Sequence, residues 1–304
     1  MPDIGVLICG HGSRDTQGTR EFASLADAVA RRFPHWASAY GFLEFAEPTI
    51  PDGLKRLAAL GAKTVIAVPG LLFSARHAKT DIPTILRDSA PPGVEIRYAD
   101  PLGFDPKLLR AAADRIEEAE TSSTASVTRE ETLLMLAGRG TTDAEANGDL
   151  AKLTRMLWQG MEFGLGATCY SGIAEPQPAA ALEQAVELGY LRIVVMPYFL
   201  STGALVDRVY AATDEAAARH PTIEFVKASY LKAHPLIVEV FSDRIIQALE
   251  GPASKHVHDH ADDHDHDCDD ATCDDEWHNH APRDPVVEPD IYSLAPRTRS
   301  GARS

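Results

Sequence analysis

Apolar residues up to Glu250 fall into two kinds of segment. Short, almost continuous apolar runs end at glycine or proline, which is typical of strands buried on both faces of a parallel sheet. Between these runs apolar residues recur at helical spacing, as they do from Phe22 to Phe33. Strands that alternate with helices of this length predict βαβ units and a doubly wound parallel sheet.

The same order of predicted elements occurs twice, and each half is expected to end in a helix that closes its own sheet. The first half has predicted strands at 4–9, 38–45, 63–68 and 94–98, and predicted helices at 22–33, 48–60 and 106–118. The second half has predicted strands at 132–137, 166–172, 191–196 and 223–228, and predicted helices at 144–159, 179–187, 206–219 and 235–249.

The two halves are copies in sequence, because residues 4–83 recur at 132–211 with a constant offset of 128. The copies differ after their first strands, where Gly10-His11-Gly12-Ser13 corresponds to Gly138-Arg139-Gly140-Thr141. They differ again after the third strand, where His77 corresponds to Leu205. One copy therefore keeps two histidines that the other lacks.

This repeat divides the chain. We predict two tandem α/β domains of the same kind related by internal duplication, followed by a disordered tail. The N-terminal lobe spans 1–119, a polar linker 120–131, the second lobe 132–250 and the tail 251–304.

Charge and composition exclude several functions. The formal net charge is −16, and the segment from Glu250 onward carries −9 of it, so the folded part is moderately acidic and nucleic acid is not an expected partner. A bilayer-spanning run of about 20 apolar residues is missing, and the N-terminus has no secretory pattern. We therefore expect a cytoplasmic protein with no membrane contact. Four cysteines are too few for a disulfide framework.

Three titratable residues follow predicted strands of the first half. His11 comes just after the first strand, Glu44 falls at the end of the second, and His77 lies in the loop after the third. Ligands of open parallel sheets bind beyond the carboxyl ends of the strands, so these groups are expected to share one cleft. Asp15 breaks the dinucleotide-binding glycine spacing, no Walker lysine is present, and no nucleophilic triad can be identified.

Three segments of the first half, 10–14, 42–48 and 72–83, resemble the signature of the small ATP-independent chelatases that insert cobalt or iron into sirohydrochlorin. The second half resembles the C-terminal repeat of the long bacterial form through 138–143 and 197–200, and the resemblance covers about residues 3–250. It implies an enzyme with two chelatase-like domains. The motifs do not separate the two metals; the histidine-rich tail favours cobalt and a role in cobalamin biosynthesis. A ferrochelatase for siroheme and a non-enzymatic cobalt or nickel storage or delivery protein are the alternatives.

The resemblance also assigns roles. His11 and His77 are expected to bind the incoming metal. Either of them or Glu44 is expected to accept the two pyrrole protons, and the division between base and ligand stays open. No prosthetic group is implied. Co²⁺ is the expected substrate metal, with Fe²⁺ or Ni²⁺ as alternatives, and sirohydrochlorin is the other partner. One chain holds both halves, so we expect a monomer that works as a pseudo-dimer.

Basic residues near the predicted strand ends are candidates for binding the carboxylates of sirohydrochlorin, although ordinary surface charge explains any one of them equally well. They are Arg14, Arg76, Lys79, Arg139 and Arg208. Arg139 replaces His11 in the repeat, which suggests that a metal ligand became a substrate anchor.

The tail mixes imidazole, carboxylate and thiol groups at high density. A metal reservoir or delivery segment is the functional interpretation, and an inert solubilising tail is the alternative. Its candidate ligands are His256, His258, His260, His264, His266, Cys268, Cys273, His278 and His280.

Overall fold

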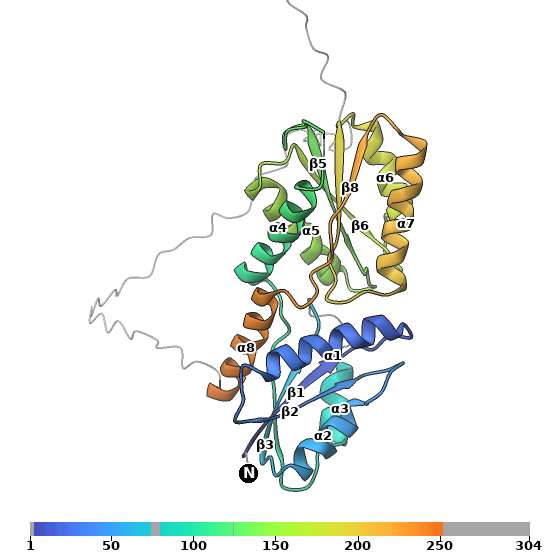
Figure 1. The fold of residues 1–304 in the computed structure, drawn as a ribbon. Coiled ribbons are helices and arrows are strands. Elements are labelled where there is room, and N and C mark those ends of the chain that lie inside the picture. Colours follow the sequence, from blue (N-terminus) through green and yellow to red (C-terminus); the bar gives the residue numbers. More distant parts are fainter. Residues whose placement is uncertain (1–2, 74–79, 124, 252–304) are drawn as a thin grey trace, which may run out of the picture. The chain divides into compact units, whose positions relative to one another are not determined.

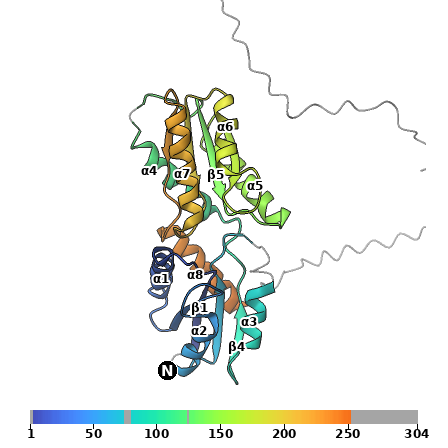
Figure 2. The same ribbon diagram turned by 90° about the vertical axis from the view of Figure 1, so that its right-hand side faces the viewer.

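The computed structural model describes residues 3–73, 80–123 and 125–251, which form two parallel α/β lobes (Figures 1 and 2). The sheet of the first lobe has the order β2-β1-β3-β4, and that of the second has the order β6-β5-β7-β8. All neighbouring strands pair in parallel, which confirms the predicted fold class. The strands are β1 (Ile4–Gly10), β2 (Ala37–Phe42), β3 (Thr64–Pro69), β4 (Glu95–Tyr98), β5 (Thr132–Gly138), β6 (Leu165–Tyr170), β7 (Arg192–Pro197) and β8 (Glu224–Lys227).

The helices follow the predicted order with one addition. The helix α3 is not among those that apolar spacing predicts, because it is short and buries only Ile82 and Leu86. The helices are α1 (Thr16–Ala30), α2 (Ile50–Ala59), α3 (Ile82–Asp88), α4 (Pro106–Glu120), α5 (Ala144–Gly160), α6 (Pro178–Glu187), α7 (Ala204–Arg219) and α8 (Pro235–Glu250). None of the helices in the described ranges is long and apolar enough to cross a membrane.

Each central strand is buried on both faces, which explains its unbroken apolar sequence. On β1, Val6 and Ile8 belong to one core cluster, and Leu7 and Cys9 belong to another on the opposite face of the sheet. Successive strand residues point to opposite faces, so both faces need apolar side chains. Burial also raises the pKa of the Cys9 thiol, which keeps it protonated.

The last helix of each copy packs against the other lobe. Helix α4 contacts α5, β7 and β8 of the second lobe, whereas α8 contacts β3, β4 and α1 of the first (Figure 1). Arg97 of β4 donates to the carbonyl of Leu249 in α8 at 2.6 Å, and Arg115 of α4 donates to the carbonyl of Leu231 at 3.1 Å. The prediction that each helix closes its own sheet is therefore wrong. The spacing of apolar residues identifies the buried face of a helix but not the sheet that covers it.

This exchange predicts that the first lobe depends on α8. Phe241 of α8 is fully buried in the core cluster that includes β1 residues, whereas Ile246 of the same helix is 38% exposed. We expect Phe241→Ala to lower the free energy of unfolding by about 3–5 kcal/mol, since it leaves a large cavity. Ile246→Ala is the matched control and should cost less than about 1 kcal/mol. Urea unfolding measures both, and equal losses would contradict the packing described here.

Candidate active site

The loop after β1 and the loop after β2 are in direct backbone contact. The amide of Leu43 donates to the carbonyl of Gly10 at 2.8 Å, and the amide of Glu44 donates to the carbonyl of His11 at 3.0 Å. Gly12 has a φ of 95°, and a Cβ at this position would clash with the carbonyl of Glu44. Glycine is needed here both for its backbone conformation and for the space that it leaves. The strand β2 itself ends at Phe42, so Glu44 lies in the loop rather than in the strand.

This contact brings His11 and Glu44 together. His11 Nε2 lies 3.3 Å from Glu44 Oε1, and the His11 side chain is 17% exposed whereas that of Glu44 is 41% exposed. The other ring nitrogen, Nδ1, lies 3.1 Å from the carbonyl oxygen of Gly12. Nε2 is thus the ring nitrogen that faces the Glu44 carboxylate, and Nδ1 the one that faces a backbone carbonyl.

Such an arrangement suits a bound cation. Two ligand atoms 3.3 Å apart can both bind one metal through bonds of about 2.1 Å that meet at roughly 100°. An imidazole and a carboxylate are acceptable ligands for divalent cobalt, iron or nickel. Within the described residues no cluster of three or more His, Cys, Asp or Glu side chains is suited to hold a metal. His77, the third predicted member of the site, lies outside those residues.

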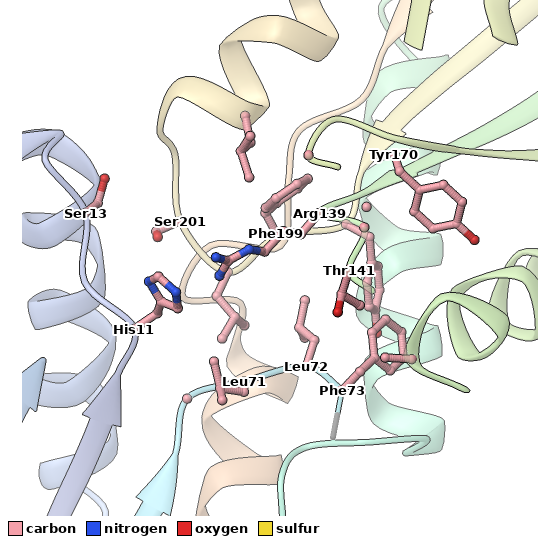
Figure 3. Close-up of a pocket in the computed structure, with 18 of the residues that line it drawn as sticks. His11, Ser13, Leu71, Leu72, Phe73, Arg139, Thr141, Tyr170, Phe199 and Ser201 are labelled. Carbon is pink, nitrogen blue, oxygen red and sulfur yellow. The ribbon is translucent and has the colours of Figure 1, made fainter. Parts of the chain in front are cut away.

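Arg139 of the second lobe faces this pair. Figure 3 shows its guanidinium directed toward the His11 ring from the opposite side of the cavity. Burial lowers the pKa of Arg139, and the nearby carboxylate of Glu44 acts in the opposite direction. An arginine nevertheless stays charged in proteins. The position that corresponds to His11 therefore brings a fixed positive charge to the site.

A cavity of about 610 Å³ extends from His11 between the strand-end loops of both copies (Figure 3). Many of its lining residues occupy equivalent positions of the repeat, among them His11 and Arg139, Ser13 and Thr141, and Phe42 and Tyr170. The loops after β3 and β7 supply apolar side chains to its walls. The location at the carboxyl ends of parallel strands is the one that the fold predicts for a ligand.

The loop after β7 is fixed by a carboxylate from the first lobe. Glu21 of α1 accepts a hydrogen bond from the backbone amide of Thr202 at 2.9 Å and another from the hydroxyl of Tyr230 at 2.7 Å. Burial and the adjacent Glu21 carboxylate raise the pKa of Tyr230, so this hydroxyl stays a donor. Gly18 lies so close to the Thr202 carbonyl that a side chain there would clash. One cavity wall is thus held in place across the two lobes.

The predicted site residues are distributed unevenly. The structure brings His11, Glu44 and Arg139 together. The guanidinium of Arg14 lies 5.0 Å from the centre of the Phe45 ring, outside the cavity lining. Arg208 donates to the carbonyl of Ser171 and does not line the cavity either. Arg76, Lys79 and the predicted ligands of the tail, like His77, lie outside the described residues.

Asp81 and Tyr198 are among the cavity residues that the sequence analysis does not predict. Asp81 lies at the start of α3 and Tyr198 just after β7. Tyr198 is 2% exposed, and among the described residues its hydroxyl has no hydrogen-bond partner. Its place directly after a strand end is the signal that points to it, as it does for His11.

A family model described as CbiX matches this chain at residues 5–119 and again at 133–248. The chain belongs to the CbiX family. The two matched segments begin at equivalent positions of the repeat and extend past it to the ends of α4 and α8, so the family model matches each half of the chain separately. The sequence-based resemblance to this family is confirmed.

Curated relatives of this CbiX-family chain carry two activities. A sirohydrochlorin cobaltochelatase of Priestia megaterium is 32% identical over 253 residues, which is 81% of this chain and 80% of that protein. A sirohydrochlorin ferrochelatase of the same organism is 28% identical over 256 residues, 84% of this chain and 93% of that protein.

A solved structure agrees with the fold of this CbiX-family chain. The sirohydrochlorin chelatase SirB from Bacillus subtilis subspecies spizizenii, in complex with cobalt, has a TM-score of 0.69 at 25% identity. The match covers 84% of this chain and 98% of the SirB chain. The two-lobed architecture is thus shared along almost the whole of that protein.

The glycine between the two loops gives a test of the site's construction. We expect Gly12→Ala to lower the free energy of unfolding by about 1–3 kcal/mol, because a Cβ is disfavoured by the φ of 95° and meets the Glu44 carbonyl. Gly148→Ala is the matched control, since nothing lies near a Cβ there; in the helix α5 it should stabilise by about 0.5–1 kcal/mol. Thermal unfolding measures both, and a neutral Gly12→Ala would refute the close contact.

Proposed function

We propose that this protein inserts Co²⁺ into sirohydrochlorin without ATP, in the cytoplasm, as a step of cobalamin biosynthesis. The pairing of Glu44 with His11, which lines one end of a cavity of about 610 Å³, is the observation that carries the proposal. The cobaltochelatase and ferrochelatase names of the relatives support a sirohydrochlorin chelatase. The histidine-rich tail favours cobalt over iron. Insertion of Fe²⁺ for siroheme is the second candidate, because relatives of similar identity carry that name.

In this proposal His11 Nε2 and Glu44 hold the metal together with His77. Three protein ligands leave positions open, and the metal can pass from them to the pyrrole nitrogens without first losing every ligand. Two N–H protons must leave the macrocycle as the metal enters. The carboxylate of Glu44, which is the more exposed partner of the pair, and the imidazoles are the available acceptors.

The charge of the site also fits a polycarboxylate substrate. Arg139 places a fixed positive charge beside the His11–Glu44 pair, where it opposes the approach of a free metal cation. A bound carboxylate of sirohydrochlorin would neutralise that charge and is well matched to a guanidinium. Arg14, Arg76, Lys79 and Arg208 are proposed for the remaining carboxylates. Because one chain supplies both cavity walls, we propose that the monomer is the active form.

The central test is metal insertion followed by absorbance with sirohydrochlorin and either Co²⁺ or Fe²⁺. The parent protein should insert Co²⁺ faster. His11→Ala and His77→Ala should each lower the rate at least a hundredfold, since each removes a ligand or a proton acceptor. His220→Ala is the matched control, because His220 also pairs with a glutamate, Glu183 at 3.0 Å, but lies away from the cavity. Unchanged rates in both site variants would refute the site.

The same assay separates an enzyme from a storage protein. A chain that ends at Glu250 lacks the proposed tail ligands but keeps the cavity. An enzyme retains its rate at saturating metal after this truncation, whereas a store loses most of its metal capacity and shows no catalytic turnover.

The role of Arg139 is tested by its effect on substrate binding. Arg139→Ala should raise KM for sirohydrochlorin about tenfold, as expected for the loss of one partly buried charged contact. Arg155→Ala changes an exposed arginine of α5 outside the cavity lining and should leave KM unchanged. An unaltered KM in Arg139→Ala would show that this residue does not anchor the substrate.

A further inference from the structure

Three side chains of the first lobe form a row that starts at the proposed metal site. The ring of Phe45 lies 6.3 Å from the ring of His11, centre to centre. The guanidinium of Arg14 lies 5.0 Å from the centre of the same Phe45 ring. In this row Phe45 is the shared neighbour of the proposed metal ligand and of a cation.

Phe45 stands out for its backbone and its exposure. It has a φ of 63°, which bulky side chains rarely adopt, and its side chain is 53% exposed. Such a conformation persists only where the surroundings impose it, and residues held in this way cluster at functional sites. Phe45 directly follows Glu44, whose backbone is fixed by its hydrogen bond to His11. The same constraint that positions the carboxylate therefore also presents the aromatic ring.

The row belongs to the lobe that keeps the histidine. At the equivalent positions the second lobe has Arg139, Thr142 and Ile173, so all three members of the row differ. Exposure of an apolar side chain does not by itself indicate function. Leu60 and Leu188, which occupy equivalent positions of the repeat, are 44% and 41% exposed at the ends of α2 and α6. Phe45 differs from that pair because its neighbours are the proposed metal ligand and a cation.

We propose that Phe45 is a substrate-positioning residue that packs against the conjugated ring of the tetrapyrrole, between the metal at its centre and the carboxylate at its rim that Arg14 binds. The inference rests on the proposed function and adds a contact to it. A metallated tetrapyrrole with acidic side chains has the same order from centre to edge: metal, apolar conjugated ring, anionic rim. An aromatic ring such as that of Phe45 packs favourably against a conjugated macrocycle. The cation–π contact with Phe45 would hold the Arg14 guanidinium in place to bind a carboxylate at the rim.

The position of Phe45 outside the cavity lining is consistent with this role. The cavity reaches His11 but includes neither Glu44 nor Phe45 in its walls. A macrocycle whose centre meets the metal between His11 Nε2 and Glu44 must extend to both sides of that point. One side of it occupies the cavity, and the other lies over Phe45. An exposed phenylalanine is then covered when substrate binds.

The contact is with the macrocycle before and during metal insertion, so it contributes equally to the bound substrate and to the transition state. Such uniform binding affects KM and leaves kcat unchanged. Phe45→Ala should therefore raise KM for sirohydrochlorin about tenfold, with kcat within about twofold of the parent. The affinity for Co²⁺ alone should not change, because His11 and Glu44 are retained.

The experiment combines equilibrium binding of metal-free sirohydrochlorin with the kinetic constants of the full-length chain. Phe45→Ala removes the ring. Phe45→Gly also removes the ring, and because glycine adopts a positive φ without strain, this variant should fold as stably as the parent. Phe45→Tyr should restore affinity. Leu60→Ala is the matched control, since it truncates another exposed apolar residue of the same lobe away from the site.

The outcomes distinguish the two proposals. Weaker sirohydrochlorin binding in both Phe45→Ala and Phe45→Gly, with unchanged Co²⁺ affinity, supports the role. Unchanged sirohydrochlorin affinity overturns it, and so does a loss confined to kcat and Co²⁺ affinity, because Phe45 would then only hold Glu44 in place. If the parent binds sirohydrochlorin but inserts no metal, the proposed function fails while the binding comparison still decides the role of Phe45.

Discussion

The site depends on the close approach of two loops at Gly12 and Glu44. Two backbone hydrogen bonds extend the pairing of β1 and β2 past the ends of the strands, and a glycine leaves room for the Glu44 carbonyl. At this contact His11 Nε2 lies 3.3 Å from Glu44 Oε1, Phe45 follows with its positive φ, and His11 lines one end of the cavity. The backbones that carry His11 and Glu44 are thus joined directly, and in the proposed function a metal would meet a pair that is already assembled, so that little ordering is needed on binding.

Much of this was predictable from sequence because it depends on local patterns. Apolar runs such as 4–9 identify strands buried on two faces, and the constant offset of 128 identifies the duplication. The order of residues along strand ends places His11 and Glu44 in one cleft without any knowledge of distances. Other features depend on long-range packing. Helices α4 and α8 could each pack on either of two chemically similar sheets. The spacing of apolar residues within a helix does not indicate which of the two sheets it contacts.

The same distinction explains the basic residues. Sequence places Arg139 and Arg208 near strand ends equally well, yet one faces the His11–Glu44 pair and the other donates to the Ser171 carbonyl. A guanidinium has several donors on a long side chain, and its partner is decided by which acceptors the fold leaves within reach. The exposure of Phe45 is unpredictable for a related reason, because an aromatic residue next to an apolar strand has the sequence pattern of a core residue. The burial of Tyr198 is equally hard to predict, because the neighbours that bury its hydroxyl come from distant parts of the chain.

The exchanged helices have a consequence for how the two copies evolve. Neither copy contains all the surfaces that its own sheet needs, because each borrows its last helix from the other. Helix α4 packs on strands of the second lobe and α8 on strands of the first, so the two copies are joined by packing as well as by the linker. Each molecule therefore always pairs one unlike half with the other, and the two copies can carry different residues, such as His11 and Arg139, at equivalent positions of one site.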